Sequence, residues 1–400
     1  MRNGFREAYY RRFHWILLSL IGSVDFVRGA LFIALIPIYV PEHLRATVFL
    51  SGAIISAMYG ADTIFKPTAG WLVDYFGPRA TLLISLPCAL LGLSFFLWSK
   101  SGAILILGAI LYGLGCAPVW PAVVSTLVEY SPTGEKAKTL SSIYVVWLLG
   151  MGSGAVLINL VYHLGPKLLI TVLVGIFCIP LILTLHIRKW ISKRRTNKEA
   201  NAGRHLLLMI REIWNFRVLL PGAFTQTLAL GMLLPLLQPF CKLVYGLNQR
   251  AYGILILVGG LITIAMLVPI GKMVDRFGYR MFLVVGFFMG GTLLVAINHY
   301  PNHLLIYPYA ILLGISYAFI LPAWNGLLAT RLPSEVRASL YSIIMSIEGL
   351  GVAAGPVIGG KLGELFSYSF TFGVSATALF IMGAFYMILL RRPMGGRAGH

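Results

Sequence analysis

Long apolar stretches alternate with short polar segments along the whole chain. Twelve of these stretches reach about 20 residues, the length that a helix needs to cross the hydrocarbon core of a bilayer. They cover residues 15–38, 48–70, 80–98, 102–125, 139–161, 168–187, 218–240, 251–271, 281–298, 304–326, 338–360 and 369–390. This pattern predicts an all-α membrane protein with twelve transmembrane helices and both termini on the same side.

Composition supports the same fold class. Of the 400 residues, 58% are hydrophobic and only 11% are charged, whereas a soluble domain carries about 25% charged residues because its surface faces water. The four cysteines form no CxxC pair, so we expect neither a metal site nor a redox site. The chain is therefore predicted to be a multi-pass protein of the cell membrane.

The formal net charge of +19 is explained by where the basic residues lie. The N-terminus, the even-numbered loops and the C-terminus hold 24 of the 32 Lys and Arg residues, and the opposite side holds six. Cytoplasmic segments of membrane proteins are enriched in Lys and Arg. The distribution places both termini in the cytoplasm and accounts for the charge without a nucleic-acid partner.

The longest polar segment divides the chain near its middle. Residues 188–217 are rich in Lys and Arg, and we interpret them as a cytoplasmic linker. They separate an N-terminal six-helix bundle, residues 1–187, from a C-terminal six-helix bundle, residues 218–400. The basic side chains of the linker serve either as a topology signal or as a contact for anionic membrane lipids.

One motif occurs twice at a constant offset of 201 residues, about half the chain. It follows the second and the eighth predicted helix, and we expect a loop in both places. The matching positions are Gly70 and Gly271, Asp74 and Asp275, Gly77 and Gly278, and Arg79 and Arg280. The offset indicates two homologous halves.

The paired motif resembles the Gly-x-Leu-x-Asp-x-x-Gly-x-Arg loops of the major facilitator superfamily. The resemblance covers the whole chain and implies a secondary transporter that works by alternating access, with two parallel six-helix repeats. It also implies that Asp74 and Asp275 act as cytoplasmic latches, each lying against a helix end in one state. A carboxylate at a helix N-terminus is stabilised by about 0.3–1 kcal/mol. For the second copy, a plain turn remains the alternative.

Five charged residues lie inside predicted helices, where each charge costs about 2.5–3.5 kcal/mol. They are Asp25, Arg28, Asp62, Lys66 and Glu348. At about 1.5 Å of rise per residue, the three carboxyl groups lie near the bilayer midplane, where transporters of this kind place their sites. The spacings of three and four residues put Asp25 beside Arg28 and Asp62 beside Lys66.

Two interpretations of these charges remain open. They form self-neutralising structural pairs, or they form a site in which Asp25 or Asp62 takes up a proton while Arg28 holds an anionic or hydroxyl-rich group. Glu348 has no cation near it in the sequence, so it is either protonated or paired across the interface between the halves. Because a low dielectric favours the protonated carboxyl group, we hypothesise that a proton gradient drives transport without any other cofactor.

Four stretches resemble one branch of the superfamily, the bacterial flippases that move the glycolipid anchor of lipoteichoic acid. They are residues 25–29, 147–150, 321–325 and 346–349. The resemblance implies roles for Asp25, Arg28, Asp62 and Gln226. Position 25 is Asp where that branch has Glu. Glu348 stands where the branch has Gln, which leaves substrate identity or coupling stoichiometry open.

The charges are distributed unevenly between the two halves. Helices 1 and 2 carry four of them, whereas the spans of the second half carry Glu348 alone. This asymmetry favours an amphiphilic substrate, and the resemblance to the flippases implies a glycolipid such as diglucosyl-diacylglycerol. The candidate binding residues include Asn325 and the three tryptophans Trp120, Trp147 and Trp324. Each tryptophan either stacks on a sugar ring or packs between helices.

Other functions remain as alternatives. A drug/proton antiporter of this fold has a Gly-Pro stretch in helix 5, but here it lies in helix 11, at residues 355–360. A sugar or small-metabolite transporter needs a more polar second half than Gln226, Gln238 and Asn325 provide. No HExxH or GxSxG motif occurs, so we predict neither an enzyme nor catalytic residues. We expect a monomer.

Overall fold

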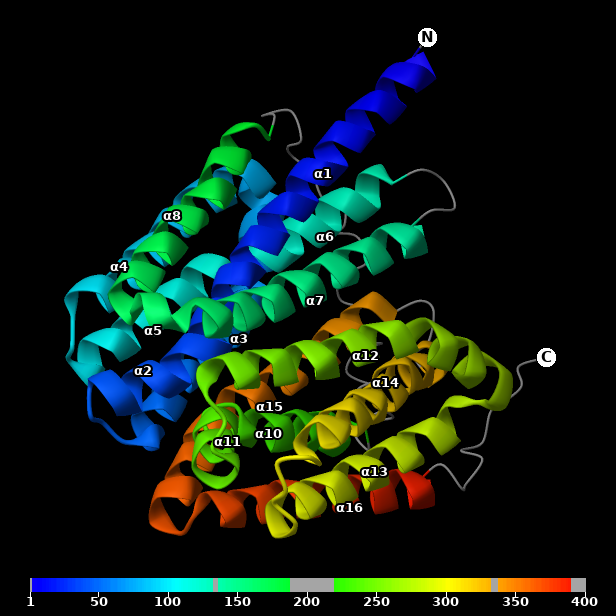
Figure 1. The fold of residues 1–400 in the computed structure, drawn as a ribbon. Coiled ribbons are helices and arrows are strands. Elements are labelled where there is room, and N and C mark those ends of the chain that lie inside the picture. Colours follow the sequence, from blue (N-terminus) through cyan, green and yellow to red (C-terminus); the bar gives the residue numbers. More distant parts are fainter. Residues whose placement is uncertain (1, 132–135, 188–218, 332–336, 390–400) are drawn as a thin grey trace.

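The computed structural model of the protein describes residues 2–131, 136–187, 219–331 and 337–389 (Figure 1). Within these ranges every regular element is helical, which confirms the predicted all-α fold class. The linker predicted at residues 188–217 lies outside the described residues.

The first half contains α1 (Arg2–Arg28), η1 (Gly29–Leu35), α2 (Ile36–His43), α3 (Val48–Phe76), α4 (Pro78–Trp98), α5 (Gly102–Cys116), α6 (Val119–Tyr130), α7 (Lys136–Val161), η2 (Tyr162–Leu164) and α8 (Pro166–Leu185). The second half contains α10 (Leu220–Leu233), α11 (Leu237–Tyr245), α12 (Gln249–Phe277), α13 (Tyr279–His299), α14 (Ile306–Arg331), α15 (Arg337–Leu365) and α16 (Tyr368–Leu389).

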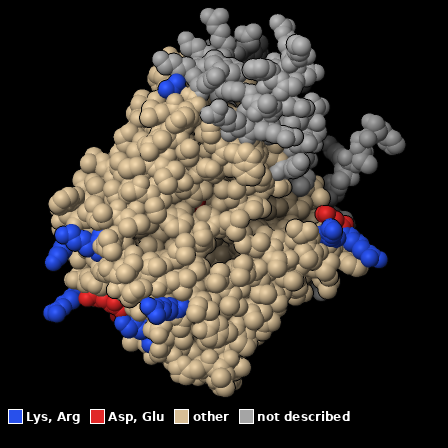
Figure 2. Space-filling model, turned by 45° about the horizontal axis from the view of Figure 1, so that its top comes forward, with Lys and Arg blue, Asp and Glu red and all other residues tan. Residues whose placement is uncertain are grey.

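The described helices account for the predicted membrane spans. Eleven helical stretches are long and apolar enough to cross a membrane, and α10 with α11 makes a twelfth span that is bent by 47°. On the face drawn in Figure 2, charged side chains lie near the edges of the described surface, and uncharged residues form its broad middle. The protein is therefore a multi-pass membrane protein.

Three predicted spans depart from a regular α-helix, although only the seventh is bent by more than 40°. In the first span, α1 passes into the π-helical η1 before α2 begins. In the fourth, α5 ends at Cys116 and α6 begins at Val119, with Pro118 between them. In the seventh, Pro235 lies in the bend between α10 and α11. Proline lacks the N–H group that would continue the helical hydrogen bonds, so two of these breaks have a local cause.

The repeated motif differs from the predicted loop. Gly70 and Asp74 lie inside α3, which continues to Phe76, and the second copy lies inside α12 in the same way. Only Gly77 and Gly278 turn the chain, with φ of 83° and 85°. The prediction of a loop from Gly70 onward was wrong, because one glycine on a helix surface weakens the helix without ending it.

The two halves have separate hydrophobic cores that meet along a few helices. One core draws its buried residues from 13–187 and the other from 219–386. Between the halves, α3 packs against α15 and α7 against α12. At Gly52 an added Cβ would lie 2.1 Å from the carbonyl oxygen of Pro356, so these backbones touch directly. The two bundles diverge toward the ends that carry the chain termini (Figure 1).

Candidate functional site

Three ion pairs join four charged side chains of α1 and α3. Arg28 Nη1 lies 3.4 Å from Asp25 Oδ1, and Arg28 Nη2 lies 3.5 Å from Asp62 Oδ1. Lys66 Nζ lies 3.0 Å from the second oxygen of Asp62, Oδ2. Asp25 and Asp62 are only 3% and 4% exposed. The structure thus contains both pairs predicted within helices, and it adds the bridge from Arg28 to Asp62 between helices.

The chain geometry around Arg28 explains how the cluster is held. Arg28 ends α1, and the π-helical η1 begins at Gly29, a kind of element found frequently at functional sites. A Cβ at position 29 would lie 2.0 Å from the carbonyl oxygen of Met151 in α7, so glycine is required for this approach. Arg28 Nε is buried and has no hydrogen-bond partner among the described residues, which leaves one donor for a ligand.

A second polar cluster surrounds Glu348 in the other half. The indole Nε1 of Trp324 donates to Glu348 Oε1 at 2.6 Å, and the amide Nε2 of Gln226 donates to the same oxygen at 3.3 Å. Among the described residues no cation pairs with this carboxyl group. Of the two possibilities left by the sequence, pairing with a cation across the interface is therefore not seen here.

The three tryptophans lie in two different places. Trp120 and Trp147 meet edge to face with ring centroids 6.4 Å apart, and Tyr144 packs against both rings. Trp324 is 4% exposed and belongs to the Glu348 cluster. Asn325, by contrast, is exposed, and its amide donates to the carbonyl oxygen of Leu321 one turn earlier.

An apolar pocket of about 410 Å³ lies between α3 and α5. Ala61 and Ile64 on α3 and Ile110 and Leu114 on α5 contribute to its wall. The four residues of the charged cluster do not line it, because Asp62 points from another face of α3 than Ile64.

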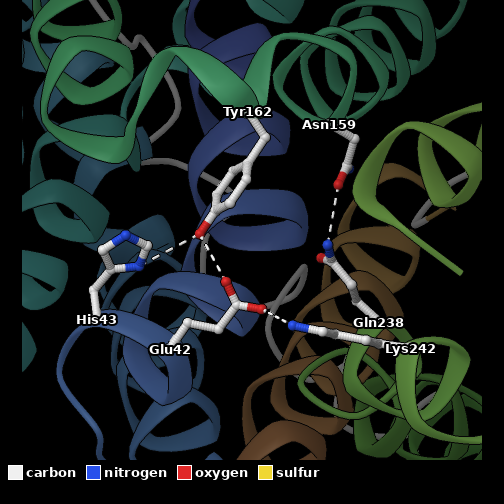
Figure 3. Close-up of polar contacts among 6 residues, drawn as sticks. All are labelled: Glu42, His43, Asn159, Tyr162, Gln238 and Lys242. Carbon is white, nitrogen blue, oxygen red and sulfur yellow. Dashed lines mark hydrogen bonds and ion pairs between the residues drawn. The ribbon is translucent and has the colours of Figure 1, made fainter. Parts of the chain in front are cut away.

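The halves are joined at the end opposite the N-terminus (Figure 3). Lys242 of α11 forms an ion pair with Glu42 of α2, and the Tyr162 hydroxyl donates to the other oxygen of Glu42 at 3.3 Å. Gln238 Nε2 donates to Asn159 Oδ1 at 3.1 Å, with both residues buried. We call these five residues the cross-half bridge. It closes one end of the interface between the bundles.

The motif residues lie at the opposite ends of the helices and make few contacts. Asp74 and Asp275 are exposed, and among the described residues neither forms an ion pair or hydrogen bond. Arg280 Nη2 donates to the carbonyl oxygen of Met387 within its own half. Arg79 Nε is buried and has no hydrogen-bond partner in the described part of the chain. Among the described residues, the structure therefore contains no latch contact of Asp74 or Asp275.

Several residues of these clusters were not predicted from the sequence. Glu42, Lys242 and Tyr162 lie at helix ends, where charged and aromatic residues are ordinary, so the sequence gave no signal for their contact. The ring of Tyr386 lies 6.0 Å from that of Trp324. In the sequence, a tyrosine in an apolar helix indicates only a packing residue, so this contact was not predicted. Only the polar character of Asn159 and Gln238 inside apolar spans could have drawn attention to them.

Comparison with known proteins gives a consistent result. The profile described as Major Facilitator Superfamily matches residues 17–221 and 219–399, once for each half. A protein of Staphylococcus saprophyticus named proton-coupled antiporter flippase LtaA is 24% identical over 379 residues, with 93% of each chain covered. Proteins of the same name from Staphylococcus haemolyticus and Staphylococcus aureus are also 24% identical, with 95% and 93% of each chain covered.

Solved structures show the same fold. The nucleoside transporter NupG superimposes with a TM-score of 0.76 at 13% identity, covering 95% of this chain and 99% of that one. Its D323A mutant gives a TM-score of 0.80 at 12% identity, covering 94% and 99%.

Proposed function

The chain belongs to the major facilitator superfamily, and from this premise we propose that it is a proton-coupled antiporter that moves an amphiphilic lipid across the cell membrane. The substrate class we favour is a glycolipid such as diglucosyl-diacylglycerol. The relatives named as flippases support this choice. The observation that carries it is the asymmetry of the two halves. The buried charged residues of the described chain, Asp25 and Asp62, both lie in the first half.

An amphiphile needs a polar and an apolar surface within one site. Arg28 has a free buried donor for a hydroxyl-rich or anionic head group, and Trp120 and Trp147 offer ring faces and edges for a sugar. The apolar pocket between α3 and α5, which lies on another face of α3 than Asp62, is suited to methylene groups. In this proposal, Asp25 or Asp62 takes up the proton.

We further propose that both termini face the cytoplasm and that residues 1–187 and 218–400 move as two bodies joined by the linker 188–217. The basic residues of the even-numbered loops support this orientation. The cross-half bridge then lies on the outer side of the membrane, and the described conformation is open toward the cytoplasm. When the bridge separates, Asp74 and Asp275 come to lie against helix ends of the other half.

Reconstitution into liposomes tests this function. Fluorescently labelled diglucosyl-diacylglycerol is added with the purified protein, and a membrane-impermeant quencher reports the leaflet that holds the label. We expect an imposed pH gradient to change the protected fraction with the wild type and not with Arg28→Leu. Equal protection with and without the gradient would contradict proton coupling. Equal protection with and without protein would contradict glycolipid transport.

One observation favours a second candidate, export of lipophilic cations. Glu348 has no cation partner in the described part of the chain, and Trp324 and Tyr386 lie beside it. Carboxylates with aromatic neighbours bind organic cations. Ethidium efflux from the same liposomes, with no movement of the labelled glycolipid, would replace the first proposal by this one.

A further inference from the structure

The second half contains a carboxyl group whose surroundings differ from those of the charged cluster. In the first half two carboxylates face two cations, so the four side chains carry no net charge before a proton is bound. Glu348 has only neutral donors, Trp324 and Gln226. A partly buried carboxyl group without a cation is neutralised most readily by a proton.

The groups around Glu348 can satisfy both protonation states. In the charged state Oε1 accepts from the indole and from the amide N–H of Gln226. The other end of that amide, Gln226 Oε1, is buried and has no hydrogen-bond partner among the described residues. Rotation of the amide by half a turn presents this oxygen to a protonated carboxyl group. Gln226 thus changes from donor to acceptor, while Trp324 remains a donor.

Among the described residues, no other charged group pairs with Glu348. The described α10 carries no titratable side chain. On α3 the nearest charged residues, Asp62 and Lys66, pair with each other. Tyr317 of α14 and Tyr386 of α16 are the phenols that face Glu348, and the Tyr386 hydroxyl is buried without a partner in the described residues. The carboxyl group therefore meets neutral neighbours on every helix that packs around it.

The site also lies at the contact that must move. A Cβ added at Gly349 would lie 2.6 Å from Thr63 Oγ1, so the residues next to Glu348 and Asp62 touch across the interface. The packing of α3 on α15 continues from there to Gly52 and Pro356, toward the end closed by the cross-half bridge. Separation of the two helices would expose Glu348 to the opposite side of the membrane.

We propose that Glu348, Gln226 and Trp324 form a second proton-binding site, so that each half carries one site and a full cycle moves more than one proton. This deepens the proposed antiport and rests on it for the transport step. Binding adds one proton to Glu348 Oε1 and removes one negative charge. The new O–H group donates to Gln226 Oε1 after the amide has rotated, while the same carboxyl oxygen still accepts from the Trp324 indole.

Infrared difference spectroscopy of the reconstituted protein tests the site without any substrate. Buffer is exchanged between acidic and alkaline pH, and the stretching band of protonated carboxyl groups is followed. We expect Glu348→Gln to remove one component that titrates in the wild type. The matched control is Glu364→Gln, the same change at an exposed position of the same helix. Glu364→Gln should remove a different component, that of an exposed carboxyl group. Loss of the same component in both variants, or no loss in Glu348→Gln, would overturn the proposal.

Trp324→Phe gives a readout that a structural role would not produce. It removes the N–H group that stabilises the charged carboxylate, so the Glu348 band should titrate at a more alkaline pH than in the wild type. A band that titrates at the wild-type pH would argue against the proposal.

Counting protons separates this inference from the proposed function. An internal pH dye and the labelled glycolipid are read in the same liposomes. Glu348→Gln should lower the number of protons per lipid by one, and an unchanged ratio would refute the second site. If the wild type moves no glycolipid, the proposed function fails, whereas the infrared result still decides whether Glu348 binds a proton.

Discussion

At the scale of single residues, Asp62 has the central place in the charged cluster. Its two oxygens pair with two cations, Arg28 from α1 and Lys66 from its own helix. Asp25 by contrast pairs with Arg28 alone. Removal of the Asp62 carboxylate therefore leaves one negative charge facing two positive ones in a largely buried site.

We predict that Asp62→Asn destabilises the protein by about 3 kcal/mol, since removing one member of a buried ion pair leaves an unpaired charge. It should also abolish transport driven by a pH gradient. Thermal unfolding and the liposome assay measure the two effects. The double variant Asp62→Asn, Lys66→Met restores the charge balance, so it should recover stability without transport. Recovery of both would assign the cluster a purely structural role.

The two glycines of the first motif copy should respond in opposite ways to alanine. Gly77 has φ of 83° and ψ of 157°, a conformation that costs other residues about 1–3 kcal/mol. Gly70 lies inside α3, where an added Cβ meets no atom within 4 Å, and alanine favours a helix by about 0.5–1 kcal/mol. Thermal unfolding should therefore show that Gly77→Ala is less stable than the wild type. Gly70→Ala should be at least as stable as the wild type. The reverse order would contradict this assignment of the turn.

At the scale of helices, the interface between the halves depends on small residues where α3 meets α15. Gly52 leaves no room for a side chain against Pro356, whereas at Gly60 the nearest atom, the Cβ of Ala353, would be 3.9 Å away. Ser56 lies between these positions, and its Oγ accepts a hydrogen bond from the backbone N–H of Val357 at 2.9 Å. Close packing therefore holds the two halves together at one end.

We predict that Gly52→Ala forces α3 and α15 apart and shifts the protein toward the conformation that is open at this end. Gly60→Ala is the matched control and should leave the conformation unchanged, because its methyl group fits. Spin labels at the exposed positions Thr47 and Glu364 report the separation. A longer distance in Gly52→Ala alone is expected, and identical distances in both variants would contradict the packing argument.

The same scale shows why helix breaks were harder to anticipate than helices. Span lengths follow from apolar composition, and the twelve predicted spans are present. The local sequence contains no comparable signal for the π-helical η1. Glycine is required at position 29 because the backbone of Met151, which belongs to another helix, lies close to it. Such a contact between helices cannot be predicted from local sequence. The motif glycines gave the opposite error. Gly70 and Gly271 predicted loops, but both lie inside helices.

At the scale of the whole molecule, the cross-half bridge selects one of the two access states. Its ion pair is partly exposed, with side-chain exposures of 56% for Lys242 and 29% for Glu42. Pairs of this kind contribute about 0–1 kcal/mol. The bridge therefore biases the equilibrium between states without locking it, as an alternating-access cycle requires.

We predict that Lys242→Glu lowers the population of the described conformation by up to about fivefold, which corresponds to 1 kcal/mol. The same pair of spin labels measures the populations. The charge exchange Glu42→Lys with Lys242→Glu should restore the wild-type distribution, and high salt should bring the wild type closer to the single variant. A distribution that ignores both the exchange and the salt would exclude a role for the ion pair.

The sequence alone determined the features that depend on local spacing or composition. Apolar length defined the spans, the offset of 201 residues defined the repeat, and intervals of three and four residues placed Asp25 beside Arg28 and Asp62 beside Lys66. Only the tertiary structure joined these pairs through Arg28 and Asp62, and only it gave Glu348 its partners from α10 and α14. These contacts link residues far apart in the chain, and their geometry depends on how the helices pack. Which end of the protein is closed depends on a small free-energy difference between two arrangements of the two halves. No local sequence pattern predicts that difference.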